Sequence, residues 1–294
     1  MTRQLSVAIL LVLAAAGVPS GATAAVDLTT PEAQLLALRR IQCSAIDGKA
    51  ETFYWKGTAW SRVPGEPDRQ LFRVEGMNVR QCGPMPKATN KAEFRLVGRE
   101  ILLYEDPVTG AVLNEWTNPW TGKTVEVIHV ANDPVNGNYS LVGRDGQPTK
   151  LPFESMGNQW WLSMPIPLFY TNPLGGDYQR YVGGTYHVTE LFNFLGAVSD
   201  LEDRRKDSVA SAVSWQRISP WLPWMEMGDR PGIIYFHTAG LKLAAWDDLP
   251  TVMKAEIERR WPEYRNPPPL DDSRPNETSW TYFKKALDAR KPAH

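Results

Sequence analysis

The first candidate for chemistry in this sequence is a carboxyl group placed among apolar residues. In the run GTYHVTELFNF, the alternation of a β-strand puts Glu190 on the same face as Tyr186, Val188, Phe192 and Phe194. A carboxylate in such surroundings is costly unless it is paired, and burial raises its pKa toward neutrality. A group of this kind can accept or donate a proton at neutral pH.

Two histidines and one arginine extend this set. His129 falls on the inward face of the run KTVEVIHVAN, and His237 shares a face of GIIYFHTAG with apolar residues. Arg217 could pair with Glu190 and contact a ligand. Together these residues predict a cofactor-free acid–base set, in which Glu190 or His129 accepts a proton and Tyr186 or His237 donates one. The structural alternative is a hydrogen-bonded core histidine and a Glu–Arg pair that only joins strands.

An unusual apolar loop is the second candidate for a binding site. The segment ISPWLPWMEMG, Ile218–Gly228, contains two prolines beside Trp221, Trp224 and Met225. It connects two predicted strands, so it either rims the mouth of a pocket or plugs the interior. Trp215 on the preceding strand is a further candidate contact for a ligand, although tryptophan there is also typical of a core.

Motifs and composition narrow the classes of function. The sequence contains no HExxH, P-loop, CxxC, GxSxG or dinucleotide-binding motif, and its four histidines lack metal-ligand spacing. We therefore expect no metal and no cofactor. A net charge of -1 gives no long-range attraction to nucleic acid.

Three functions remain open. The first is a cofactor-independent lyase, isomerase or decarboxylase that acts on a small hydrophobic or aromatic molecule. The second is a non-catalytic carrier of such a ligand. The third is a structural or partner-binding exported protein with a filled core. The sequence makes no prediction of oligomeric state.

A repeated turn indicates the fold. DPVTG (Asp106–Gly110) recurs as NPWTG (Asn118–Gly122) and DPVNG (Asp133–Gly137), and a looser copy, NPLGG, begins at Asn172. Asp or Asn can accept a backbone N–H, proline presets φ, and glycine supplies a left-handed position. Between and around these turns lie about nine or ten strand-like runs. They predict an all-β antiparallel meander that closes into a barrel or barrel-like sandwich.

The helices are few and peripheral. One is expected from Thr30–Pro31, a second over about residues 248–261 and a last one from about Thr278. The proline-rich segment between the last two predicts an extended strap along the surface.

The N-terminus and the cysteines indicate a compartment. Residues 1–24 have a basic start, an apolar run and a small-residue cleavage pattern, as in a secretory signal peptide. The mature chain, residues 25–294, is then expected to form a single all-β domain without a membrane span, periplasmic or secreted. Cys43 and Cys82 are expected to form a disulfide there, the alternative being two separate buried thiols.

Several motifs together resemble a known family. They are GEP…LF…G (Gly65–Gly76), LYEDPVTG…W.NP.TG (Leu103–Gly122), VIHVANDPVN, RISPWLPWMEMG..PG (Arg217–Gly232) and the closing LP…P…PP…TSW..F. In this order they resemble the family called domain of unknown function 1838 over nearly the whole mature chain. The resemblance implies a single, often exported domain and leaves its activity open.

Overall fold

The computed structural model describes residues 28–170, 174, 178, 181 and 185–291. The predicted signal peptide lies outside the described residues, and so does most of the turn that begins at Asn172. Within the described ranges, no helix is both long and apolar enough to cross a membrane.

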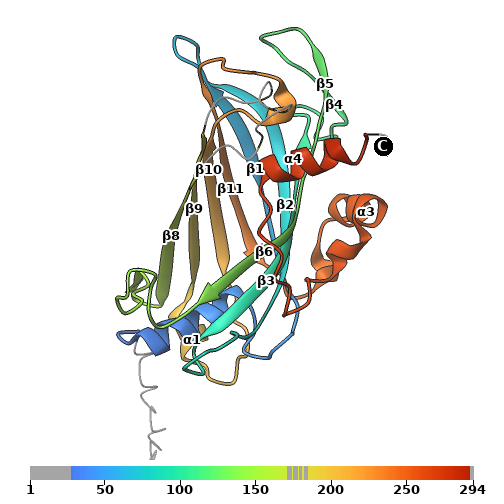
Figure 1. Cartoon of the computed structure of the whole chain (residues 1–294). Helices are drawn as coiled ribbons and strands as arrows, with labels where there is room; N and C mark the ends of the chain where they lie inside the picture. The colour runs from blue at the N-terminus through green and yellow to red at the C-terminus, as the bar shows by residue number, and fades with distance from the viewer. Residues whose placement is uncertain (1–27, 171–173, 175–177, 179–180, 182–184, 292–294) are drawn as a thin grey trace, which may run out of the picture.

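A curled antiparallel sheet forms the body of the protein (Figure 1). Within the described residues it has nine strands in the order β6-β3-β2-β1-β11-β10-β9-β8-β7, and a separate two-stranded hairpin pairs β4 with β5. The strands are β1 (Glu51–Arg62), β2 (Arg69–Pro84), β3 (Phe94–Glu105), β4 (Glu115–Thr117), β5 (Thr124–Glu126), β6 (Val130–Tyr139), β7 (Phe153–Met156), β8 (Gln159–Tyr170), β9 (Tyr186–Ala197), β10 (Ala212–Ser219) and β11 (Ile233–Lys242). The predicted all-β antiparallel fold is confirmed. The sheet is a curled half-barrel, because its outer strands, β6 and β7, are not paired with each other.

Two of the repeated turns form as predicted. Asp106 Oδ1 accepts hydrogen bonds from the backbone N–H groups of Val108 and Thr109, and Gly110 has a φ of 72°. Asn118 does the same for the next hairpin, which ends at a glycine with a φ of 70°. The side-chain acceptor and the left-handed glycine therefore close both turns.

The third copy is not a turn, so that prediction was wrong. Residues 133–137 lie inside β6, and residues 135–137 pair with β3. On the other side, the backbone N–H of Asn136 donates to Asn276 Oδ1 at 2.8 Å, and Glu277 N–H donates to the carbonyl of Pro134 at 3.0 Å. A strand on one side and the proline-rich strap on the other supply the bonds that a turn would have made internally.

Strand β8 contains Pro165 and Pro167, so its sequence is not typical of a strand. Proline lacks an N–H and is normally confined to strand edges. Here β7 covers only residues 159–162 of β8, so both prolines lie beyond it, where one edge of β8 has no β7 partner.

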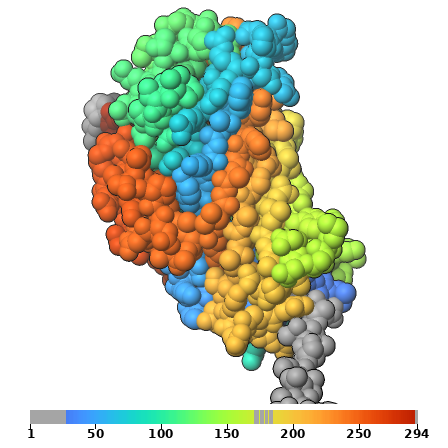
Figure 2. Space-filling model, turned by 180° about the vertical axis from the view of Figure 1, so that it is seen from behind, coloured from blue at the N-terminus to red at the C-terminus, as the bar shows by residue number. Residues whose placement is uncertain are grey.

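The helices cover the ends and one outer face of the sheet. The predicted helices are confirmed as α1 (Pro31–Gln42), α3 (Thr251–Arg260) and α4 (Ser279–Asp288), and the short α2 covers Val198–Glu202. Single turns of 3-10 helix, η2 (Pro223–Met225), η3 (Trp246–Asp248) and η4 (Pro262–Arg265), occur in the loops. The segment with α3 lies over the outer face of β2 and β3, where Met253 and Ile257 join a second core with Met77 and Ile101. Figure 2 shows this orange segment at the left, with the blue strand β1 and then the orange and yellow strands to its right.

The predicted disulfide is confirmed. Cys43, which ends α1, is bonded to Cys82 on β2 across a sequence separation of 39 residues. A cross-link over such a loop stabilises the fold by about 4 kcal/mol on the chain-entropy account. It also fixes the end of α1 against the inner face of β2.

The apolar loop fills the upper interior of the half-barrel. The Trp224 ring lies 5.6 Å from Phe72, 5.3 Å from Tyr104 and 5.9 Å from Trp116, measured between ring centroids. The buried Asn118 amide donates to the carbonyl of Met225 at 2.9 Å. The NPWTG turn and the apolar loop therefore lock together, and the loop plugs the interior.

We predict that this lock depends on the amide of Asn118. Asn118→Asp keeps the turn acceptor but places a buried carboxylate against the Met225 carbonyl, so the free energy of unfolding should fall by about 2–4 kcal/mol. The reciprocal change Asp106→Asn lies in a turn that makes no such contact with the apolar loop. It should lower the free energy of unfolding by less than about 1 kcal/mol. Urea denaturation of both variants measures this, and equal losses would contradict the lock.

Candidate functional site

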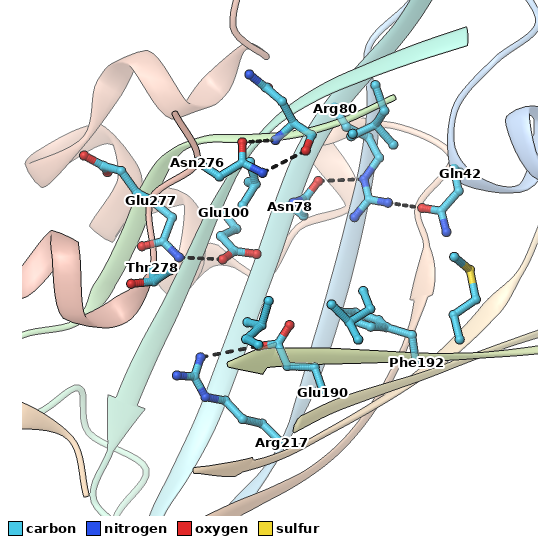
Figure 3. A pocket seen from close by; sticks show the side chains of 18 of the residues that line it. Gln42, Asn78, Arg80, Glu100, Glu190, Phe192, Arg217, Asn276, Glu277 and Thr278 are labelled. Atoms are coloured by element: carbon cyan, nitrogen blue, oxygen red, sulfur yellow. Dashed lines mark hydrogen bonds and ion pairs between the residues drawn. The ribbon is translucent and has the colours of Figure 1, made fainter. Parts of the chain in front are cut away.

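A cavity of about 550 Å³ lies between the two halves of the sheet (Figure 3). One wall comes from the inner faces of β2, β3 and β6, and the opposite wall comes from β8, β9 and β10. The strap before α4 borders it with Asn276, Glu277 and Thr278. This volume is typical of sites for small molecules.

The two walls differ in chemistry. Apart from Glu190, strands β8 and β9 contribute apolar side chains, whereas β2, β3 and β6 contribute mainly amides and charged groups. The apolar members are Met164, Ile166, Leu168, Phe192 and Phe194, and the polar members include Asn78, Arg80, Glu100, Asn132 and Asn136. The cavity can therefore hold an apolar body and orient polar atoms at its ends.

Glu190, Arg217 and Tyr186 meet at the cavity, as the alternation on β9 predicts. Glu190 and Arg217 are register partners on β9 and β10, and Arg217 Nη1 lies 3.3 Å from Glu190 Oε1. Arg217 Nη2 donates to the Tyr186 hydroxyl at 3.0 Å and to Ser279 Oγ at 2.9 Å. One buried guanidinium thus fixes a carboxyl group, a phenol and the first residue of α4.

Burial raises the pKa of two carboxyl groups of the cavity, those of Glu190 and Glu100. Desolvation raises the pKa of Glu190 to about 7, against the opposing charge of Arg217, and the nearby Glu100 adds to the rise. Burial likewise raises the pKa of Glu100, whose Oε1 accepts a hydrogen bond from Asn132 at 2.6 Å. Near neutral pH Glu190 can therefore accept or donate a proton.

Arg80 is a cavity residue that alternation along β2 did not single out. Its Nε donates to Asn78 Oδ1 at 2.6 Å, its Nη1 donates to Gln42 Oε1, and its guanidinium lies 4.5 Å from the centre of the Phe53 ring. Asn78 and Arg80 share the inward face of β2. The pattern was hidden because the outer face of β2 is also apolar, being covered by α3.

Neither histidine of the predicted acid–base set reaches the cavity. His129 is buried in the core, where its Nδ1 accepts the backbone N–H of Tyr104 at 3.1 Å. Burial lowers the pKa of His129 to about 3. His237 lies on the exposed outer face of β11, because Ile234 and Phe236 are the residues that turn inward. The expected meeting of Glu190 with a histidine is therefore wrong.

The aromatic ligand contacts expected from the sequence belong to the core. Trp215, Trp221, Trp224 and Met225 are buried, and none of them is among the residues that line the cavity. Trp215 packs on Phe236 with ring centroids 5.6 Å apart. Of the predicted ligand contacts, only Arg217 reaches the cavity, because the apolar loop packs into the opposite end of the half-barrel.

The fold and the cavity define a curled, antiparallel half-barrel protein with ionisable groups in its interior. Among the described residues, no group of three or more His, Cys, Asp or Glu side chains is arranged to hold a metal ion. The chain belongs to the family described as "Protein of unknown function (DUF1838)", whose family model matches residues 48–287. The resemblance read from the sequence motifs is thus confirmed. No curated protein matches the chain.

We predict a pH dependence of stability that comes from Glu190. Its pKa in the folded state, about 7, exceeds the ordinary value of 4.5, so the folded protein keeps this proton to higher pH than the unfolded chain. The contribution to stability is present at low pH and is lost as the pH rises from 4.5 to about 7. Relative to Glu190→Gln, wild type should lose about 2–3 kcal/mol over this interval. If chemical denaturation shows that the free energies of unfolding of wild type and Glu190→Gln change in parallel with pH, this assignment is contradicted.

Proposed function

We propose that the protein binds a small, largely apolar molecule in the cavity and exchanges a proton with it through Glu190, as a cofactor-independent lyase, isomerase or decarboxylase. The observation that carries the proposal is a carboxyl group with a pKa of about 7 among the apolar side chains that β8 and β9 bring to a 550 Å³ cavity. A proton-transfer group works best when its pKa lies near the working pH.

The remaining residues have distinct parts in this proposal. Arg217 holds Glu190 in place and stabilises its charged form when the proton leaves. Tyr186, bonded to the same guanidinium, brings a hydroxyl group to the cavity. Phe192 and Phe194 offer the apolar surface on which the ligand lies.

A non-catalytic carrier is the second candidate. It is favoured by the absence of His129 and His237 from the cavity lining. In a carrier, Glu190 and Arg217 would only orient the ligand.

We also propose that the chain is exported after removal of residues 1–24. The Cys43–Cys82 disulfide supports this, because such bonds persist in oxidising compartments.

We predict that native mass spectrometry of the purified protein will detect a bound apolar species and a chain that begins near Ala25. Met164→Trp fills the cavity from β8 and should remove the bound species. Met156→Trp makes the same change on β7, where the side chain is 76% exposed, and should retain it. Retention by both variants would place the ligand elsewhere.

The extracted species then separates an enzyme from a carrier. Incubated with wild type in D₂O, it should gain deuterium at carbon, as followed by NMR. Glu190→Gln should slow the labelling by about 10²–10⁴-fold, whereas Glu100→Gln, in the same cavity, should retain it. Labelling that is equal in wild type and Glu190→Gln would remove Glu190 from the chemistry, and none in either protein would indicate a carrier.

A further inference from the structure

The end of the cavity around Arg80 presents hydrogen-bond donors. Arg80 uses Nε and Nη1 on the side-chain oxygens of Asn78 and Gln42. Because a guanidinium can only donate, these two bonds fix the amides with their oxygens toward Arg80. The NH₂ groups of Asn78 and Gln42 are therefore turned away from it. Figure 3 shows the Gln42 nitrogen and the remaining Arg80 nitrogen on the cavity side.

These donors have no acceptor among the residues that the structure describes. Across the residues that the structure describes, no hydrogen bond is made by Arg80 Nη2, by the Asn78 amide nitrogen or by the Gln42 amide nitrogen, and all three residues line the cavity. The side-chain oxygens of Asn78 and Gln42 are already occupied by Arg80. What the site lacks is a group that only accepts, and an ionised carboxylate is such a group.

Among the described residues, the charge of Arg80 has no ion-pair partner. Its close contacts are two neutral amides and the face of Phe53, and the Glu100 carboxyl group interacts with its charge from beyond ion-pair distance. Burial lowers the pKa of Arg80 to about 10, so it stays charged at neutral pH. A half-buried charge without an ion pair is costly, and an anionic ligand would offset that cost.

Aromatic side chains lie between the Arg80 end of the cavity and Glu190. Arg80 lies over Phe53, whose ring centroid is 6.1 Å from that of Phe194. Glu190 precedes Phe194 by four positions on β9, or about 13 Å along an antiparallel strand. The ring of Phe192, between them, stacks parallel to that of Phe194. Arg80 and Glu190 are thus separated by an apolar floor.

We propose that the ligand is an elongated apolar carboxylic acid, whose carboxylate binds the Arg80, Asn78 and Gln42 donors while its apolar body lies on Phe192 and Phe194 toward Glu190. This inference rests on the proposed function, because it names the chemical class of the molecule in the same cavity. Arg80 acts here as a binding residue for the anionic end, and Glu190 meets the opposite end.

A matched pair of probes tests the proposal. Biphenyl-4-carboxylate and biphenyl-4-carboxamide have nearly the same shape and differ in charge, and both bindings are measured by calorimetry at neutral pH. Wild type should bind the carboxylate at least about tenfold more tightly than the amide, as expected for a hydrogen bond to a charged group. Arg80→Gln should lose this preference and keep its affinity for the amide. Arg73→Gln removes the same charge from the exposed face of the same strand and should keep the preference.

A second variant covers the case in which Arg80→Gln does not fold. Gln42→Glu retains Arg80 and gives it an internal carboxylate, so the variant should fold and lose the preference for the carboxylate probe. Equal binding of both probes to wild type overturns the anion site and leaves the proposed function standing. Binding of neither probe overturns both. A preference that survives in Arg80→Gln or in Gln42→Glu removes the assignment to Arg80.

Discussion

The pairing of β1 with β11 is the contact on which the rest of the structure depends. It joins the N-terminal meander, β1-β2-β3-β6, to the C-terminal meander, β7 to β11, and so brings the polar and apolar walls of the cavity face to face. The two strands approach so closely that only glycine fits at two positions. A Cβ on Gly57 would lie 2.0 Å from the His237 carbonyl oxygen, and one on Gly240 would lie 1.9 Å from that of Tyr54. The curl of the sheet at this seam thus requires residues without side chains.

The cavity departs from the rest of the interior in how its charges are balanced. In the core, the hydrogen bonds of Asn118 are all made within the fold itself. In the cavity, Arg80 donates hydrogen bonds only to neutral amides, and Glu190 is held in surroundings that favour its protonated form. Both arrangements cost stability, and a protein would gain more stability from apolar residues at these positions. Such costs concentrate where a molecule has to be recognised or transformed.

Much of the fold was predictable from the sequence, and the failures have physical causes. Alternation on β9 identified Glu190 and Tyr186 because the opposite face of that strand is more polar. The same argument failed for His237, since β11 carries Ile233 and Tyr235 on its outer face and Ile234 and Phe236 on its inner face. Where both faces are apolar, alternation does not tell which is inward.

The same limit explains why the polar end of the cavity was not predicted. On β2, Met77 and Val79 face the helix-covered outer side, and Asn78 and Arg80 face the cavity. Gln42 comes to Arg80 from a helix far away in sequence, through the position that the Cys43–Cys82 bond fixes. Contacts of this kind depend on tertiary structure, and no local pattern in the sequence specifies them.

The strap before α4 has a consequence for the behaviour of the molecule in a crowded solution. The Asn276 side chain donates to the Asn136 carbonyl and accepts from its N–H, as a neighbouring strand would. One side-chain amide therefore caps part of the exposed edge of β6. The other edge strand, β7, has only four residues, and the uncovered part of β8 carries prolines. Both ends of the sheet are thereby poor templates for another chain, so an open half-barrel can avoid edge-to-edge aggregation without closing.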